Sequence, residues 1–195
     1  DKRRLVILVV GETARSDHMS INGYDLKTNP NLEQEEIISF DKMTSCGTDT
    51  ALSVPCMFSL LDRSSYNHAN GKNMSNVLDI ISHAGVSVLW LDNNSSSKSV
   101  ADRITFKDYR SSDQNSICNP ECRDEGMLVN LQNYIDEQDN RDVLIVLHSM
   151  GSHGPAYYKR YPEQFEVFLP VCKTNQLNEC SDEEISNAYD NTILY

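Results

Sequence analysis

The sequence predicts an α/β fold with a mostly parallel sheet flanked by helices. Three apolar runs, at residues 5–10, 86–91 and 143–147, have the continuous aliphatic character of strands buried on both faces. Helical patterns lie between these runs, and such alternation is typical of parallel strands joined by helical crossovers. At 195 residues the chain is long enough to form one domain with a sizeable core.

Three segments carry apolar residues at helical spacing. Residues 73–84 form the first predicted helix, which Gly85 ends as a C-terminal stop. Residues 126–138 form the second. The third begins at Ser181, whose spacing from Glu184 is that of a capping box. The stretches 92–125 and 151–181 are predicted as long loops, and long loops in such folds are often functional.

Composition and charge exclude some classes of protein. The formal net charge is −12, which argues against a nucleic-acid partner because phosphate backbones are bound by clustered Lys and Arg. No run approaches the 18 apolar residues of a membrane-spanning helix. The chain begins in charged residues that lead straight into a strand and ends within an apolar periodic pattern. We therefore expect both ends to be cuts in a longer parent chain.

The six cysteines fall into three close pairs. Each pair flanks a short loop, which favours local disulfides and hence an oxidising compartment. A zinc framework is the alternative, but its usual repeated two-residue spacing is absent. The predicted bridges are Cys46–Cys56, Cys118–Cys122 and Cys172–Cys180.

Polar residues gather where the predicted strands end. Glu12 follows the first strand, Asp92 to Asn94 follow the second, and His148 and then His153 follow the third. In open α/β sheets ligands bind beyond the carboxyl ends of the strands, so these groups indicate a metal or phosphate site. Glu12 would need a partner so close to an apolar strand; a divalent metal is one possibility, and helix capping or pairing with Arg15 is the other.

Residues 44–58 combine hydroxyl groups, a glycine and a following apolar segment. A turn that leads into a helix presents backbone N–H groups and a positive dipole end, which suit phosphate. A threonine hydroxyl becomes a useful nucleophile when a metal activates it. The alternative is a helix cap with no further role, and Pro55 leaves the first helical residue open.

The other histidines and the basic residues of the first long loop have ordinary explanations. His18, His68 and His83 match no metal-ligand spacing and are expected at the surface or at helix caps. His148 is expected to be a buried, hydrogen-bonded core residue, with support of a site as the alternative. The basic residues of the loop could face lipid phosphates, although solvated positions are the default; they are Lys98, Arg103, Lys107 and Arg110.

Five stretches, in order along nearly the whole chain, resemble the lipid A phosphoethanolamine transferases that confer polymyxin resistance. The stretch 44–58 is the most specific, and the others are 9–15, 22–24, 92–95 and 151–155. The resemblance implies the alkaline phosphatase and sulfatase fold. It also implies a periplasmic catalytic domain behind a five-helix anchor in the bacterial inner membrane. Residues 1–195 would then be the N-terminal greater part of that domain, without the anchor and without a C-terminal metal-ligand segment.

The resemblance also assigns roles to individual residues. Thr50 matches the family's nucleophile. Glu12 and Thr50 both match zinc ligands of the family. Positions that line the phosphoethanolamine pocket match Asn94, Lys98, His153 and Glu163. His153 could also take part in a second metal site. Cys46 and Cys56 match a disulfide that braces the nucleophile loop, and Cys172 and Cys180 match another.

The sequence departs from the family pattern in two places. The loop between Cys118 and Cys122 is shorter than in some relatives. The Asp-His-Gly motif and a later histidine of the family are absent, so two of four zinc ligands are missing, and we expect the chain alone to be inactive.

The activity that the resemblance implies is transfer of phosphoethanolamine from phosphatidylethanolamine to a lipid A phosphate, through a covalent Thr50 intermediate at a zinc site. One alternative is a phosphoethanolamine transferase, phosphoglycerol transferase or sulfatase of the same superfamily with another acceptor. The other is a non-catalytic exported module braced by disulfides.

Overall fold

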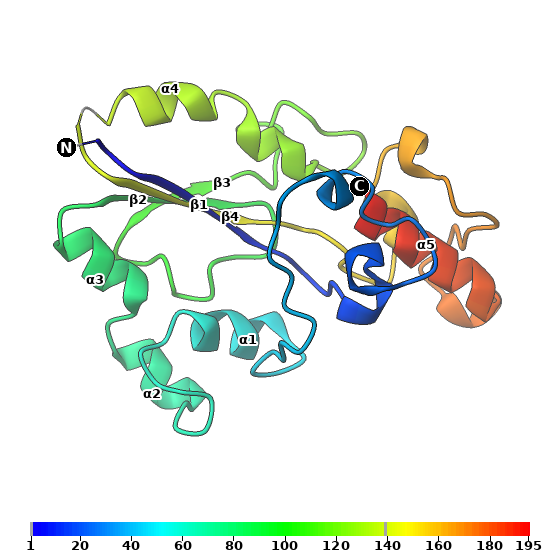
Figure 1. Ribbon diagram of the computed structural model, residues 1–195, viewed down its shortest axis with the longest axis horizontal. Helices are drawn as coiled ribbons and strands as arrows, with labels where there is room; N and C mark the ends of the chain where they lie inside the picture. The colour runs from blue at the N-terminus through cyan, green and yellow to red at the C-terminus, as the bar shows by residue number, and fades with distance from the viewer. Residues whose placement is uncertain (1, 139) are drawn as a thin grey trace. The chain divides into compact units, whose positions relative to one another are not determined.

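A computed structural model describes residues 2–138 and 140–195. The described residues form a sheet of four parallel strands in the order β1-β4-β2-β3 (Figure 1). The strands are β1 (Leu5–Val10), β2 (Ser87–Asp92), β3 (Thr105–Asp108) and β4 (Val143–His148). The prediction of an α/β fold with a mostly parallel sheet is confirmed.

The described chain divides into two compact units. The first contains the sheet and consists of the chain up to Val10 together with Thr44–Ser149. The second consists of Gly11–Met43 and Met150–Tyr195. Each unit is therefore assembled from two separate stretches of the sequence.

Both faces of the sheet in the first unit carry an apolar core, because successive side chains of a strand point to opposite faces. On one face Trp90, Val88 and Val146 pack with Val54, Phe58 and Leu78, which belong to or directly follow helices α1 (Thr50–Met57) and α3 (Val77–His83). On the other face Leu89, Leu91 and Ile145 pack with Met127 and with Leu131 and Ile135 of α4 (Leu131–Asp136). This two-sided burial explains the uninterrupted aliphatic runs of β2 and β4.

The helices of the first unit are shorter than the sequence pattern predicts. The predicted helix 73–84 is reduced to α3 (Val77–His83), and Asn73 is the last residue of a separate helix, α2 (His68–Asn73). The helix boundary between them arises because the Asn76 side chain accepts hydrogen bonds from Leu78 N and Asp79 N and so caps α3. The remaining α-helix ahead of them, α1 (Thr50–Met57), contains Pro55 and begins after the cap residue Asp49.

The predicted helix 126–138 is also divided. A 3-10 helix (Asp124–Leu128) precedes α4 (Leu131–Asp136), and Asn130 between them has a left-handed backbone with φ of 62°. Asparagine adopts that conformation more readily than most residues, and a single such residue breaks a continuous helix.

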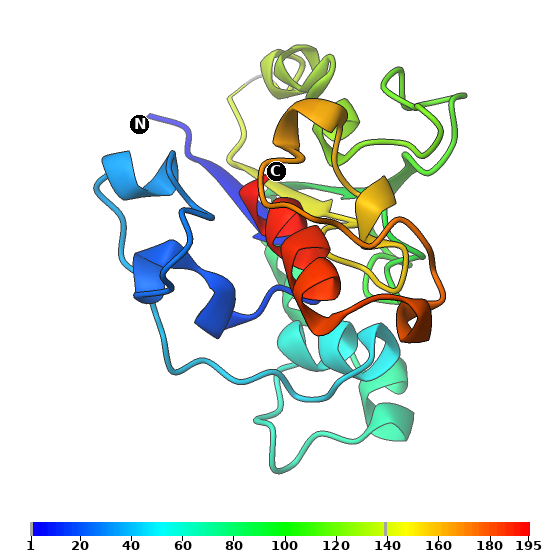
Figure 2. The same cartoon turned by 90° about the vertical axis from the view of Figure 1, so that its right-hand side faces the viewer.

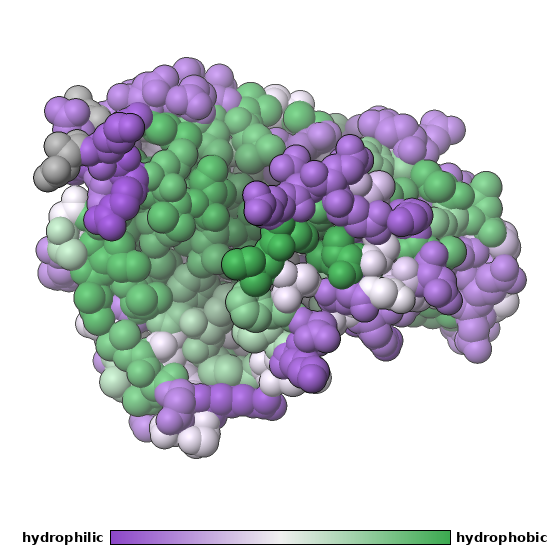
Figure 3. Space-filling view, in the orientation of Figure 1, coloured by the Kyte–Doolittle hydropathy of each residue, from purple (hydrophilic) through white to green (hydrophobic). Residues whose placement is uncertain are grey.

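Strand β1 is the main disagreement within the sheet. It pairs in parallel with β4 as predicted, but burial on both faces is wrong for Leu5 to Val9, which are 38% to 63% exposed. β1 is an edge strand with one neighbour, and neither apolar cluster includes these residues. Figure 3 shows hydrophobic residues gathered on the face of the molecule along which β1 runs. The edge strand β3, which lies inside the predicted loop 92–125, was not anticipated.

The second unit is built around α5 (Asp182–Leu194), with 3-10 turns and loops beside it (Figure 2). The capping box predicted at Ser181 is present, since Glu184 N donates to Ser181 Oγ at 3.2 Å and Ser181 N donates to Glu184 Oε2 at 2.8 Å. Short 3-10 helices are Ser16–His18, Ser20–Asn22, Leu32–Gln34, Tyr157–Lys159, Glu163–Phe165 and Leu177–Glu179.

The three predicted disulfides are confirmed as Cys46–Cys56, Cys118–Cys122 and Cys172–Cys180. The first joins the loop ahead of α1 to the helix itself, so the residues before Thr50 are held close to α1. Among the described residues no helix is both long enough and apolar enough to span a membrane.

Candidate active site

The predicted site residues divide between the two units. Thr50, Asn94 and Lys98 belong to the first unit, whereas Glu12, His153 and Glu163 belong to the second. In the sheet itself, the carboxyl ends of the strands are aligned as expected: His148 is in register with both Val10 and Asp92. Residues that follow these three positions therefore leave the sheet at one edge.

Thr50 is the first residue of α1. The preceding Asp49 caps the helix, with its side chain accepting a hydrogen bond from Leu52 N at 2.9 Å. The cap keeps the start of the helix at Thr50, where the partial positive charge of a helix N-terminus is concentrated. The Cys46–Cys56 disulfide spans this position. A nucleophile at this point would have its hydroxyl on a fixed backbone.

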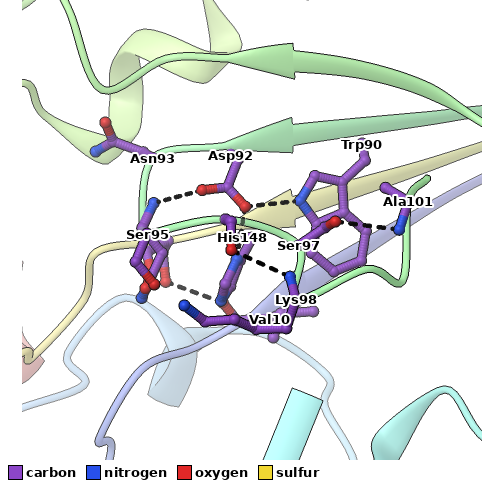
Figure 4. A network of polar contacts seen from close by, with 12 residues as sticks. Val10, Trp90, Asp92, Asn93, Ser95, Ser97, Lys98, Ala101 and His148 are labelled. Carbon is purple, nitrogen blue, oxygen red and sulfur yellow. Dashed lines mark hydrogen bonds and ion pairs between the residues drawn. The ribbon is translucent and has the colours of Figure 1, made fainter. Parts of the chain in front are cut away.

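A buried polar network lies where β2 and β4 end (Figure 4). Asp92, with no exposed surface, accepts hydrogen bonds at Oδ2 from Trp90 Nε1 (2.9 Å) and from His148 Nδ1 (2.8 Å). At Oδ1 it accepts from Asn94 N at 3.1 Å. One carboxyl group thus joins two strands to the loop that follows β2.

Asn94 is held by one backbone hydrogen bond and one side-chain hydrogen bond. In addition to its backbone contact with Asp92, its Nδ2 donates to Ser149 O at 2.9 Å, and only 3% of the residue is exposed. The contact joins the loops after β2 and β4. Asn94 therefore has a buried side chain whose orientation depends on Asp92 and on the end of β4.

The predicted core position of His148 is confirmed, since the residue is fully buried and hydrogen-bonded to Asp92. Its Nδ1 donates to Asp92, and the ring lies edge-on to Trp90 with 5.4 Å between ring centroids. The backbone of His148 also accepts a hydrogen bond from Asn93 N at 2.9 Å. Through these contacts His148 supports the loop that carries Asn94.

Lys98 ends the same loop in an unusual backbone conformation. Its φ is 52°, and that of the next residue, Ser99, is 70°. A left-handed backbone is uncommon for residues other than glycine, and such strained positions cluster at ligand sites. Lys98 lines a cavity of about 760 Å³ that also reaches Ala51, the residue after Thr50. Lys98 and the second residue of α1 thus line the same cavity.

In the second unit, Glu12 lies in a tight segment with the 151–154 loop. Glu12 Oε1 accepts a hydrogen bond from Thr13 Oγ1 at 2.6 Å, and Glu12 O accepts from Ser152 N at 3.0 Å. Gly151 has φ of 48°, and a Cβ there would lie 3.1 Å from Glu12 N and O. Glycine therefore permits both the turn and the close approach to Glu12.

Tyr189 of α5 fixes the residues after Glu12. Its hydroxyl donates to Thr13 O at 2.6 Å and accepts from Arg15 N at 2.8 Å. Burial of the Tyr189 hydroxyl raises its pKa to about 12, so the donor remains protonated at neutral pH. Tyr189 was not among the site residues expected from the sequence.

His153 and Glu163, the two residues of the second unit that are expected to line the phosphoethanolamine pocket, are both exposed. His153 Nδ1 donates to Gly154 O at 2.8 Å, which makes Nε2 the lone-pair nitrogen of a neutral ring. Glu163 begins the 3-10 helix Glu163–Phe165. Exposure suits residues that meet a ligand, and the tautomer of His153 suits a metal ligand or a hydrogen-bond acceptor.

His18 differs from the expectation of a surface or cap residue. Its Nδ1 lies 2.6 Å from Oδ1 of Asp190, which is fully buried on α5. Tyr24 donates its hydroxyl to the other oxygen of Asp190 at 2.8 Å. A buried carboxyl group requires such partners. The sequence could have indicated a buried ion pair here, because Asp190 is a charged residue next to the apolar positions of α5.

The zinc expectation involves Glu12 and Thr50, a carboxylate and a hydroxyl. A catalytic zinc ion usually has three protein ligands in addition to an open position. Among the described residues no group of three or more His, Cys, Asp and Glu side chains could hold a metal ion. The two predicted ligands do not make a complete zinc site by themselves.

The 195-residue chain is accordingly expected to bind zinc more weakly than micromolar, because two candidate ligands leave the ion mostly hydrated. Isothermal titration calorimetry with zinc, on the chain and on its Glu12→Ala variant, measures this. Micromolar or tighter binding that disappears in Glu12→Ala would contradict the expectation and would show that further ligands lie within the chain.

Comparison with known proteins gives consistent matches over the whole chain. The family model described as Sulfatase matches residues 4–195. Phosphatidylethanolamine transferase Mcr-1 of Escherichia coli is 51% identical over 201 residues, which cover 99% of this chain and 37% of the relative. The chain thus spans little more than a third of the length of that relative.

Two solved structures have the same fold. The soluble domain of lipooligosaccharide phosphoethanolamine transferase A from Neisseria meningitidis matches with a TM-score of 0.94 and 41% identity, over 100% of this chain and 59% of that one. The C-terminal periplasmic domain of phosphoethanolamine transferase EptC from Campylobacter jejuni matches with a TM-score of 0.87 and 37% identity, over 100% and 60%.

Proposed function

The chain belongs to the sulfatase family, and from that premise we propose that it carries the nucleophile of a phosphoethanolamine transferase that modifies lipid A. The fold is that of the alkaline phosphatase and sulfatase superfamily, as the sequence resemblance implied. The observation that carries the proposal is the position of Thr50 at the capped and disulfide-braced start of α1. The next residue, Ala51, lines a cavity together with Lys98.

In the proposed first half-reaction, Thr50 Oγ attacks the phosphorus of phosphatidylethanolamine. The new Oγ–P bond replaces the bond from phosphorus to the glycerol oxygen. The diacylglycerol oxygen takes up a proton in place of the one that Thr50 loses. The product is a phosphoethanolamine ester on Thr50 and free diacylglycerol. The fixed start of α1 contributes by holding the hydroxyl in one orientation.

In the proposed second half-reaction, a phosphate oxygen of lipid A attacks the same phosphorus. The Oγ–P bond breaks, the phosphoethanolamine group passes to the acceptor, and Thr50 recovers its proton. Two half-reactions at one nucleophile give ping-pong kinetics.

In this scheme Lys98 stabilises the charges of the phosphoryl group, and Asn94 lines the phosphoethanolamine pocket. Negative charge develops on the phosphoryl oxygens as the bonds exchange, and a positioned ammonium group stabilises it. Asn94 and Lys98 belong to one loop, which Asp92 and Ser149 hold in place. In the second unit, His153 and Glu163 are proposed to bind the remainder of the phosphoethanolamine group.

We propose zinc as the cofactor of the intact protein, with Glu12 and Thr50 among its ligands. When bound, zinc would make the Thr50 hydroxyl easier to deprotonate. The carboxyl group of Glu12 suits this role because oxygen ligands of this type bind zinc. The ligands that complete the site are to be sought in the intact protein.

The proposed location is the periplasmic side of a bacterial inner membrane. Three disulfides among the described residues favour an oxidising compartment. One matching structure is named as a periplasmic domain. Donor and acceptor are both lipids, so the intact protein would work at the membrane surface.

Expression of the intact protein in cells with unmodified lipid A tests the proposal. Mass spectra of the extracted lipid A should gain the mass of one phosphoethanolamine group, and the gain should be absent for Thr50→Ala. If lipid A stays unmodified while another glycan or a glycerol-phosphate polymer gains the group, the acceptor is wrong. If no phosphate ester is turned over at all, the chain is a binding module.

A further inference from the structure

A cavity of the first unit is lined by both polar and apolar residues. Its volume is about 760 Å³. The polar lining residues are His68, Ser96, Ser97, Lys98, Ser99 and Asp102, and the apolar ones are Ala51, Ala101, Ile104 and Phe106. Small-molecule sites usually measure about 300 to 1,000 Å³. The cavity is therefore of the size of a small-molecule site.

The apolar side is an extension of the sheet's own core. Phe106 on β3 is in register with Trp90 on β2, and paired residues of neighbouring strands point to the same face. Trp90 is fully buried on the face covered by α1, where its ring lies 5.4 Å from that of Phe58. Phe106 continues this apolar face to the edge of the sheet, where the residue is 39% exposed.

Ile104 joins this surface from the loop before β3. It is partly buried and packs against the same apolar cluster as Trp90 and Phe58. The apolar side of the cavity is thus supported from beneath by packed core residues.

The polar side is held by a structured loop (Figure 4). Ser97, which is 5% exposed, accepts a hydrogen bond at Oγ from Ala101 N at 3.2 Å. Ser96 Oγ accepts from Lys98 N at 3.3 Å. The left-handed backbone at Lys98 and Ser99 lies between these two contacts. The ammonium group of Lys98 is therefore presented from a constrained backbone to a cavity that is also lined by apolar residues.

We propose that this cavity binds the glycerol backbone and the first acyl carbons of the phospholipid donor. The inference rests on the proposed function and deepens it. The donor phosphate would lie toward Lys98 and Thr50, and the ester-linked chains would lie on Ile104 and Phe106. The apolar residues begin close to the nucleophile, because Ala51 follows Thr50 directly.

The donor fits this arrangement better than the acceptor does. In a phosphatidylethanolamine molecule, the acyl esters are attached to the same glycerol that carries the reacting phosphate. In lipid A the reacting phosphate is attached to a sugar ring, which is polar. An apolar surface beside the nucleophile therefore matches the diacylglycerol leaving group.

Short-chain donors in aqueous solution test the proposal without a membrane. The intact protein is assayed with dibutyroyl- and dihexanoyl-phosphatidylethanolamine, and kcat/KM is measured for each. The wild type should prefer the dihexanoyl donor by at least about tenfold, because each of its four additional methylene groups favours binding by up to about fourfold when it is buried. In Phe106→Ser the preference should fall to about twofold, and in Phe106→Leu it should be largely retained.

Ile80→Ser is the matched control. Ile80 is 48% exposed on α3 and does not line the cavity, so its replacement should leave the preference unchanged. The ratio between the two donors is unaffected when part of a preparation is misfolded, since both rates fall together. The KM for the acceptor should be the same in every variant.

Three outcomes separate the possible failures. A wild type that shows no chain-length preference, or a preference that Phe106→Ser retains in full, overturns the assignment of the cavity to the donor. A change in the acceptor KM alone assigns the cavity to the acceptor and overturns it as well. A wild type that transfers from neither donor contradicts the proposed function itself.

Discussion

Replacement of Thr50 by alanine is expected to reduce phosphoethanolamine transfer by at least about a thousandfold, because no other atom takes over from a deleted nucleophile. The fold should be unaffected. The α1 cap belongs to Asp49, the disulfide to Cys46 and Cys56, and the core contact to Val54, so alanine removes none of them. Alanine also has a high helix propensity.

The measurement is the rate of transfer by the intact protein, with circular dichroism to verify folding. Thr50→Ser retains a hydroxyl and should keep a measurable part of the rate. Thr48→Ala removes a hydroxyl from the same loop and should keep nearly all of it. Near-normal transfer by Thr50→Ala would show that the nucleophile has been assigned to the wrong residue.

Replacement of Asp92 by alanine is expected to destabilise the 195-residue chain by about 4 kcal/mol, since a buried donor that loses its partner costs about 1–3 kcal/mol. Three donors depend on this carboxyl group, namely Trp90 Nε1, His148 Nδ1 and Asn94 N. The loss should be larger than for a typical single substitution, which costs about 1 kcal/mol.

Urea unfolding followed by tryptophan fluorescence measures this loss, because the chain contains a single tryptophan, Trp90, and it lies within the network. Asp113→Ala removes an exposed carboxyl group and should change the free energy of unfolding by less than about 0.5 kcal/mol. If Asp92→Ala were as stable as Asp113→Ala, the hydrogen bonds of Asp92 would not stabilise the end of the sheet.

The sequence predicted the strands well because their residues are constrained by burial on both sides. β2 and β4 lie within one residue of the predicted runs, and their aliphatic character follows from the two apolar clusters. β1 has the same composition, so its sequence could not reveal that it is an edge strand with exposed side chains. That property depends on which other segments pair with it.

Local polar contacts were harder to predict than the apolar pattern. The start of α3 depends on the Asn76 cap, and the break before α4 depends on the left-handed backbone of Asn130. In both places the periodic apolar residues continue, so periodicity alone extends the helix. β3 was missed because its four residues are too few to show a pattern within a long polar loop.

The candidate site was predicted in part. Resemblance supplied Thr50, Asn94 and Lys98, and the structure adds the residues that hold them. Asp92 and His148 lie immediately after apolar runs in the sequence, but their mutual hydrogen bond joins strands that are 56 positions apart. Only the sheet order brings these residues together.

The order of the strands also constrains when the protein can fold during synthesis. β1 comes first in sequence among the four described strands, yet its partner is β4, with Leu5 opposite Val143. The contact between Arg4 and Asp142 beside this pair likewise spans 138 residues. Such non-local pairing must close a long loop, and the entropy cost of closure comes before the stabilising contacts form. Folding is therefore slow. β1 therefore stays without its β4 partner until residues 143–148 have been synthesised, and its aliphatic side chains can associate with other apolar segments in that interval.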